Sequence, residues 1–270
     1  MNYQSWRYIN SEPLHGALNM ATDESLLYAF NPIASDPVLR FYGWNPPALT
    51  LGRFQIPEEV LDLEVCHADS LAVIRRISGG GVIYHADELT YSIVCSPSQI
   101  PAATSVKDSF RILTGFLIDF YRSIGLDASF ATDYVSDSKQ LGTRTAFCFA
   151  GNESYDILIN GKKIGGNAQR RHKNVIFQHG SIPLVNHANT GLAYMSDRSP
   201  QYALSTTSLV DCGVTMDKQL LKAMLVAAFK RCMAADLHES LLSHNEQQVS
   251  QQLFAGKYST ECWNLRGEVA

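Results

Sequence analysis

Residues 71–95 read LAVIRRISGGGVIYHADELTYSIVC, with a glycine-rich turn between two apolar stretches. The apolar run before the turn predicts a strand over residues 71–76, and the alternation after it predicts another over residues 89–95. Three consecutive glycines free the backbone to adopt positive φ and to approach a ligand closely. We therefore expect a sheet in which a candidate binding loop connects two strands.

Further strands and helices alternate on both sides of this stretch. Apolar residues at helical spacing predict helices over residues 12–30, 105–124, 215–237 and 240–255. Short apolar runs predict strands over residues 38–42, 48–52, 156–159 and 175–184. The Asn160-Gly161 dipeptide is a strong hairpin signal before a strand that starts at Lys163. This order predicts an α+β fold, with a mainly antiparallel β-sheet packed with helices and with C-terminal helices.

Composition limits the class of protein. The 270 residues are 46% hydrophobic and 18% charged, which is typical of a soluble globular protein with a large core. No apolar run approaches the ~18 residues of a membrane helix, and residues 1–7 lack the basic and apolar regions of a signal peptide. The net charge of −4 gives no electrostatic basis for nucleic-acid binding. We expect a cytoplasmic enzyme with no membrane partner.

Cysteine and histidine spacing argues against disulfides and metal. The six cysteines lie far apart without a CxxC pair, so we expect individual reduced thiols. The eight histidines form no HExxH or paired Cys/His pattern, so no metal site is expected.

The glycine-rich turn is the first candidate site. The amides of Gly79, Gly80 and Gly81 can converge on an anion or a carbonyl oxygen. Arg75 and Arg76, at the end of the preceding strand, could clamp a phosphate or carboxylate. The loop is neither a Walker loop nor a GxGxxG motif. A bare surface turn is the alternative, and the two arginines favour a binding loop.

A second candidate is the hairpin that begins at Asn160. Lys163, Gly165 and Asn167 share one strand face, and Gly165-Gly166 indicates close approach by a ligand or another backbone. We expect Lys163 to be within reach of a substrate. His85, four residues after Gly81, is expected to line the same pocket rather than to act as a catalyst.

The region around this hairpin carries unbalanced positive charge. Residues 157–196 contain five Lys and Arg and no Asp or Glu, so the rest of the chain carries a net charge of −9. Such a run is usually a solvated face, but against an acidic background it would attract acidic partners. The candidate docking residues are Arg170, Arg171 and Lys173.

Four motifs in order support a family resemblance: RFYGWNP at 40–46, RRISGGGVIYH at 75–85, GKKIGGNAQ at 161–169 and QHGSI at 178–182. Together they resemble the lipoate-protein ligase, octanoyltransferase and biotin ligase superfamily. The nearest likeness is to the cysteine-loop octanoyl-[acyl-carrier-protein]:protein octanoyltransferases, which have a Cys-Phe pair followed seven residues later by Tyr. Cys148-Phe149 and Tyr155 keep that spacing. Those relatives often have Pro-Ser after the pair, where this chain has Ala150-Gly151.

This resemblance implies a domain division and a mechanism. It implies a catalytic domain of biotin/lipoate ligase type over residues 1–210, with a C-terminal helical segment, 211–270, packed on it. Cys148 would take octanoyl from the thioester of acyl carrier protein and pass it to a lysine of a lipoyl domain. Lys163 would lower the pKa of the Cys148 thiol and hold the acyl carbonyl. No ATP, other cofactor or metal is needed for this route.

The resemblance also implies the substrate site and the acceptors. The acceptors would be lipoyl domains of 2-oxoacid dehydrogenases or the glycine cleavage H protein, which are acidic like acyl carrier protein. An apolar tunnel would hold the eight-carbon chain. Its expected binding residues are Arg75, Ser78, Gly79, Gly80, Gly81, His85, Gly165, Gly166, Asn167, Ala168 and His179.

Three alternatives remain open. The first is an ATP-dependent lipoate or octanoate ligase, in which Lys163 contacts the carboxylate and an acyl-adenylate forms. The second is an amidotransferase that moves octanoyl between lipoyl domains by the same cysteine chemistry. The third, a non-catalytic carrier-binding module, is least favoured because cysteine, lysine and glycine loop occur together.

Overall fold

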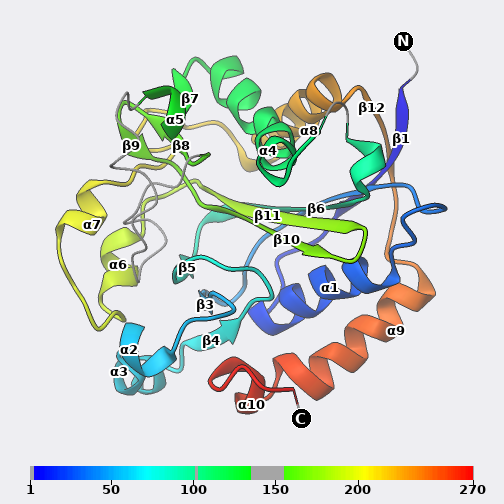
Figure 1. Ribbon diagram of the computed structural model, residues 1–270. Helices are drawn as coiled ribbons and strands as arrows, with labels where there is room; N and C mark the ends of the chain where they lie inside the picture. Colours follow the sequence, from blue (N-terminus) through cyan, green and yellow to red (C-terminus); the bar gives the residue numbers. More distant parts are fainter. Residues whose placement is uncertain (1–2, 101–102, 135–154, 270) are drawn as a thin grey trace.

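The computed structural model describes residues 3–100, 103–134 and 155–269, with a six-stranded sheet at its centre (Figure 1). In spatial order, the strands are β10 (Asn167–His172), β11 (Val175–Pro183), β6 (Glu88–Cys95), β2 (Val38–Tyr42), β1 (Gln4–Asn10) and β12 (Ala235–Glu239). The first four pair antiparallel, whereas β1 is parallel to both of its neighbours. The predicted α+β fold with a mainly antiparallel sheet is confirmed.

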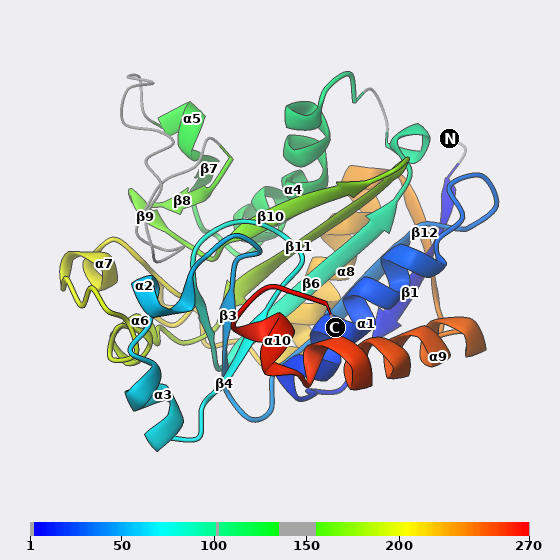
Figure 2. The same cartoon turned by 60° about the horizontal axis from the view of Figure 1, so that its bottom comes forward.

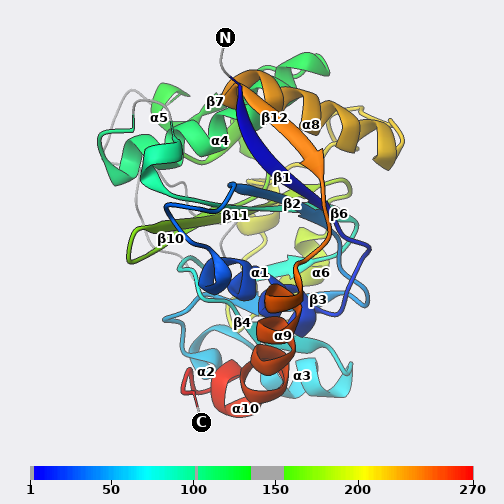
Figure 3. The same cartoon turned by 90° about the vertical axis from the view of Figure 1, so that its right-hand side faces the viewer.

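Helices cover both faces of this sheet. On one face lie α4 (Val106–Ser123) and α8 (Lys218–Met233), and on the other lie α1 (Gly16–Ala29) and α9 (His244–Leu253), as Figure 3 shows. Trp6 and Phe116 both pack edge-on against Phe229, at ring-centroid distances of 4.9 Å and 5.3 Å. In the described part of the chain, no helix is both long and apolar enough to span a bilayer.

The helix α4 follows directly from its sequence. The Ser105 hydroxyl accepts a hydrogen bond of 3.0 Å from the Asp108 amide, as an N-cap does. Leu113 and Leu117 are buried on the face toward the sheet. Gly125, with φ of +83°, follows the helix end in the left-handed conformation that favours glycine. The prediction of a helix over residues 105–124 is confirmed.

Two small sheets lie beside the central one, and Figure 2 shows both. One has the order β4 (Ala72–Arg75), β3 (Ala48–Leu51), β5 (Ile83–His85), and the other has β7 (Ala128–Phe130), β8 (Ile157–Ile159), β9 (Lys162–Lys163). Asn160 and Gly161 both have positive φ, 51° and 74°, which a two-residue hairpin turn requires. The predicted hairpin is therefore confirmed. Short helices flank these sheets: α2 (Pro57–Val60), α3 (Leu63–Ala68), α5 (Ala131–Tyr134), α6 (Ala188–Leu192) and α7 (Gln201–Leu204).

The C-terminal part differs from its prediction. The helix expected over residues 215–237 ends at Met233, since Ala234 turns into the left-handed region with φ of 46°. The next residues form β12, which pairs with β1 at the sheet edge. The prediction of a helix through residue 237 is wrong because this pairing partner lies more than 200 residues away. The segment 211–270 thus contributes a strand to the central sheet as well as helices.

The last helical turns pack against α1. After α9 the chain continues as a π-helical turn, Phe254–Tyr258, and as α10 (Glu261–Asn264). The Lys257 ammonium donates to both carboxylate oxygens of Glu24 at 2.7 Å, and the Tyr258 hydroxyl donates to the same carboxylate. The ammonium also lies 3.7 Å from the centre of the Trp263 ring. Burial lowers the pKa of Lys257, and the charge of Glu24 opposes that change.

Removing the Lys257 ammonium tests whether its contact with Glu24 anchors the C-terminal turns to α1. We expect Lys257→Met to lower the free energy of unfolding by about 3–5 kcal/mol, because Glu24 is left buried without its cation. Urea denaturation measures the change. The double variant Glu24→Gln/Lys257→Met should recover much of the loss, and the exposed Lys230→Met should shift stability by no more than about 0.5 kcal/mol. Equal losses in the Lys257 and Lys230 variants would contradict this account.

Candidate functional site

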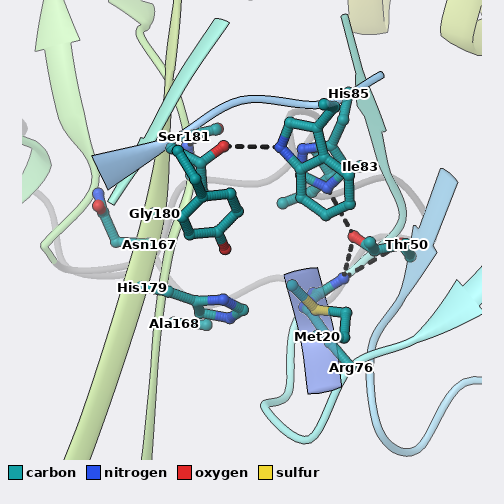
Figure 4. A pocket seen from close by; sticks show the side chains of 14 residues that line it. Met20, Thr50, Arg76, Ile83, His85, Asn167, Ala168, His179, Gly180 and Ser181 are labelled. Atoms are coloured by element: carbon teal, nitrogen blue, oxygen red, sulfur yellow. Dashed lines mark hydrogen bonds between the residues drawn. The ribbon is translucent and has the colours of Figure 1, made fainter. Parts of the chain in front are cut away.

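A pocket of about 360 Å³, including its open mouth, lies between the central sheet and the β4-β3-β5 sheet. We call it the first pocket, and Figure 4 shows its side chains converging from both sheets and from α1. Most of its exposed lining is apolar. It is lined by Met20, Tyr42, Trp44, Thr50, Arg76, Ile83, His85, Thr90, Gly166, Asn167, Ala168, His179, Gly180 and Ser181.

Arg76 holds the glycine loop from inside. Its Nη2 donates to the carbonyl oxygens of Gly79 and Gly81, both at 2.8 Å. Its Nη1 donates to the carbonyl and hydroxyl oxygens of Thr50, at 3.1 Å and 3.2 Å. The guanidinium is buried, so it adds a fixed positive charge beside the first pocket while fixing the shape of the loop.

The loop also depends on a glycine outside it, Gly52, which directly follows β3. A Cβ at Gly52 would collide with the carbonyl oxygen of Gly80, and the Arg53 amide donates to the Ser78 carbonyl at 2.8 Å. Gly80 itself has φ of 96°, in the region that favours glycine. The loop is thus packed against a neighbouring backbone rather than being a bare surface turn.

Arg75 lies away from the first pocket. Its guanidinium donates to backbone carbonyls on two segments, those of Gly52, Arg53 and Gln55 and those of Trp263 and Leu265. These contacts join the loop after β3 to the C-terminal turns. Of the two arginines that end the predicted strand, Arg76 lines the first pocket. Arg75 instead binds backbone carbonyls and holds two segments of the chain together.

His85 is fixed on every side. Its Nε2 lies 2.8 Å from the Thr50 hydroxyl and its Nδ1 2.9 Å from Glu88 Oε1. Its ring stacks on Trp44, with centroids 3.8 Å apart and planes 15° from parallel. The Trp44 indole donates to the Thr90 hydroxyl at 2.7 Å. His85 therefore lines the first pocket in a fixed orientation.

His179 links the pocket to the start of the glycine loop. Its Nε2 lies 2.6 Å from the Ser78 hydroxyl, and its Nδ1 faces Asp23 at 3.9 Å. Burial, reinforced by the charges of Arg76 and His85, holds the pKa of His179 well below its usual 6.5. A neutral imidazole has one donor and one acceptor nitrogen. With Asp23 facing Nδ1, we infer that Nε2 accepts a hydrogen bond from the Ser78 hydroxyl.

The second glycine pair forms another wall. Gly165 has φ of 76°, and a Cβ there would collide with the Ser181 carbonyl oxygen. Asn167 accepts a hydrogen bond of 2.8 Å from the Tyr91 hydroxyl. The structure brings Gly166, Asn167 and Ala168 to the first pocket together with His85 and His179. Gly165 itself packs against the Ser181 backbone and does not line this pocket.

Lys163 is buried near this wall. Its Nζ donates to Asp156 at 2.6 Å, and both side chains are nearly inaccessible, at 2% and 3%. Its backbone pairs with the chain beyond α7, through the Ser205 carbonyl and the Thr207 amide. Lys163 does not itself line the first pocket. Cys148, its predicted catalytic partner, lies outside the described residues.

The three predicted docking residues do not share one face. Arg170 is half-buried and donates to the Ile77 carbonyl at 2.8 Å, on the side of the small β4-β3-β5 sheet. Arg171 points to the other face, where it donates to Ser109 of α4 at 2.8 Å. Lys173 is exposed in the turn between β10 and β11. Of the three, Arg171 and Lys173 are the exposed residues.

Several lining residues were not singled out from the sequence. Trp44 and Tyr42 belong to the quoted motif at 40–46 but carried no role there. Met20 and Thr50 resemble ordinary core residues of a helix and a strand, since nothing local marks them. Among the described residues, no cluster of His, Cys, Asp and Glu is arranged to hold a metal ion.

The environment of His179 predicts a dependence of stability on pH. The folded protein keeps this imidazole neutral, whereas the unfolded chain binds a proton near pH 6.5. Stability should therefore fall as pH drops below 6.5, by about 1.4 kcal/mol per pH unit from this group. Urea denaturation from pH 7 to 5 should show a shallower fall for His179→Gln than for the wild type. Parallel pH curves would contradict the assignment.

Comparison with known proteins identifies the family. The chain matches the Lipoyl protein ligase A/B catalytic domain over residues 15–238. It is 32% identical to "Octanoyltransferase LipM" of Anoxybacillus flavithermus, covering 98% of this chain and 100% of the relative. Ta0514 of T. acidophilum, solved with bound lipoic acid, superposes with a TM-score of 0.81 at 25% identity, covering 97% of this chain and 100% of that one.

A second solved structure has the same fold. The bi-partite lipoate protein ligase of Thermoplasma acidophilum, described together with its E2 lipoyl domain, has a TM-score of 0.81 at 23% identity and covers 97% of each chain. The predicted superfamily and its catalytic fold are confirmed. The protein belongs to the lipoyl protein ligase A/B catalytic-domain family.

Proposed function

We propose that the protein is an octanoyltransferase of lipoate biosynthesis. It takes octanoyl from the thioester of acyl carrier protein and transfers it to a lysine of a lipoyl domain, in the cytoplasm and without ATP or metal. The observation that carries the proposal is the largely apolar first pocket, whose lining includes Arg76, the residue that holds the carbonyls of the glycine loop, although Gly79, Gly80 and Gly81 do not themselves line it. The octanoyltransferases named LipM, to which the whole chain is similar, support it.

The first pocket suits a saturated acyl chain. Met20, Trp44 and Ile83 supply apolar walls, while Arg76 and His179 supply polar groups. Burying the roughly six methylenes of an octanoyl chain would contribute about 5 kcal/mol. The neutral His179 suits contact with an uncharged chain better than an imidazolium would. The thioester carbonyl would then lie toward the glycine loop, whose amides can donate to a developing oxyanion.

Lys163 is suited to assist a thiol nucleophile. Its ammonium is held by the buried Asp156, so its position is fixed and side-chain entropy is already lost. The hairpin that carries it continues directly into Gly166, Asn167 and Ala168 of the pocket wall. In the proposed mechanism Cys148 approaches this ammonium, which lowers the pKa of its thiol.

The chemistry proceeds in two balanced steps. The Cys148 thiolate attacks the octanoyl carbonyl, the bond from that carbonyl to the carrier's sulfur breaks, and the carrier thiolate leaves and takes up the proton that the Cys148 thiol released when it ionised. The amine of the acceptor lysine then attacks octanoyl-Cys148, forms an amide and releases the Cys148 thiol. The lipoyl domain described with the archaeal ligase supports such an acceptor.

Mass spectrometry tests the covalent step. After mixing with octanoylated acyl carrier protein, the intact wild-type protein should gain the mass of one octanoyl group. The variant Cys148→Ser should not gain it. Cys262→Ser, which changes a cysteine away from both the pocket and the hairpin, is the matched control and should load normally. Cys148→Ala that still modifies a lipoyl domain from free octanoate and ATP would overturn the transferase and favour the ligase.

Ionic strength tests recognition of the acidic carrier. Raising the salt concentration should weaken use of octanoylated carrier protein about tenfold while leaving turnover of a small octanoyl thioester nearly unchanged. The double variant Arg171→Glu/Lys173→Glu should reproduce this difference at low salt, and the exposed Lys230→Glu on α8 should not. Equal salt sensitivity for the two donors would contradict docking of the carrier through Arg171 and Lys173.

A further inference from the structure

A second pocket of about 380 Å³ lies on the other side of His85 from the first. It lies between β5, the ends of β6 and β11, and the segment after α7. The lining residues used below are Tyr84, Glu88, Pro183, Val185, Thr206 and Thr207.

Glu88 and His85 form the wall between the two pockets. Glu88 Oε1 accepts from the Thr90 hydroxyl and lies 2.9 Å from His85 Nδ1. His85 and Thr90 line the first pocket, whereas Glu88 lines the second. The two cavities thus lie on either side of the same group of hydrogen-bonded side chains.

The second pocket also adjoins Lys163. The Thr207 amide donates to the Lys163 carbonyl at 3.0 Å, and the Lys163 amide donates to the Ser205 carbonyl at 2.9 Å. Thr206 and Thr207, which line this pocket, are therefore the direct backbone neighbours of the hairpin lysine. A group that fills the second pocket therefore lies beside the residues that pair with the Lys163 backbone.

The chemistry of the lining favours an alkylammonium. The Glu88 side chain is only 3% exposed, and in the described part of the chain its hydrogen bonds use Oε1 and leave Oε2 available. A buried carboxylate is stabilised when a cation pairs with it. Tyr84, Pro183 and Val185 supply apolar surface of the kind that covers the stem of a lysine.

Among the residues that the structure describes, the charged neighbours of Glu88 do not fill this role. His85 on β5 engages Oε1, and the Lys218 ammonium on α8 donates to the Glu88 backbone carbonyl at 3.1 Å. His187 pairs with the exposed Asp87 at 2.8 Å. The ammonium of Lys163 binds Asp156. A cation brought by a partner can therefore pair with the Glu88 carboxylate.

We propose that the second pocket receives the acceptor lysine of the lipoyl domain, with Glu88 as the group that binds and deprotonates its ammonium. This inference rests on the proposed transferase function. Glu88 takes one proton from the ammonium and leaves a neutral amine. The amine nitrogen bonds to the acyl carbon, the bond from that carbon to sulfur breaks, and the second amine proton goes to the departing thiolate.

The test begins from the wild-type protein loaded with octanoyl and freed of donor. Its octanoyl group is then chased with either a lipoyl domain or hydroxylamine, a small nucleophile that is neutral at pH 7 and needs no deprotonation. Val185→Trp narrows the second pocket, and Glu88→Gln keeps both Oε1 hydrogen bonds but cannot accept the proton. Leu241→Trp, at an exposed residue that lines neither pocket, is the matched control.

We expect Val185→Trp and Glu88→Gln to slow transfer to the lipoyl domain at least tenfold, with hydroxylamine release within twofold of the wild type. The Glu88→Gln rate should rise about tenfold per pH unit toward the lysine pKa of about 10.4, while the wild-type rate levels off earlier. Equal slowing with both nucleophiles, or wild-type rates with the lipoyl domain, would overturn the lysine site. If the wild type never gains octanoyl, the proposed function fails and the inference fails with it.

Discussion

The buried carboxylate of Asp23 connects the helix α1 to three strands of the central sheet. It accepts from Arg40 at 2.7 Å, from Tyr42 at 2.8 Å and from Ser92 at 2.8 Å, and it faces His179. These partners come from β2, β6 and β11. Since a buried charge is tolerated only when it is well paired, this set of contacts restricts how α1 can sit on the sheet. The first pocket lies directly beside it.

The same carboxylate also faces a histidine that lines the first pocket. It faces His179 Nδ1 at 3.9 Å, while His179 Nε2 lies 2.6 Å from the hydroxyl of Ser78, at the start of the glycine loop. Arg76 holds the far part of that loop through its carbonyls. The loop is thus fixed at both ends by side chains that are themselves buried. A preorganised loop of this kind suits a site that must bind developing charge without rearrangement.

Much of this arrangement could be predicted from local sequence. The Ser105 cap, the spacing along α4, the Asn160-Gly161 turn and the glycine loop each follow from short-range rules, and each is where those rules put it. In the structure, His85, Asn167 and His179, which belong to three of the motifs, line one pocket. What these elements share is that the residues responsible for each structure lie within a few positions of one another.

The remainder depended on contacts distant in sequence. The strand β12 forms because β1 offers it an edge, and nothing within residues 235–239 requires a strand. Arg75 and Arg76 are adjacent and chemically identical, and only the tertiary fold directs one to the pocket and the other to carbonyls after β3 and near the C-terminus. Trp44 likewise gains its place in the pocket by stacking on His85, which lies far along the chain.

The guanidinium of Arg75 links the C-terminal turns to the backbone that supports the glycine loop. By accepting from it, the Trp263 and Leu265 carbonyls help to position the same backbone, at Gly52, against which the glycine loop packs. A tag or truncation near residues 263–265 would therefore reach the substrate cavity through two layers of contacts. In this molecule the C-terminal turns help to hold in place a loop that lies nearly 190 residues earlier in the chain.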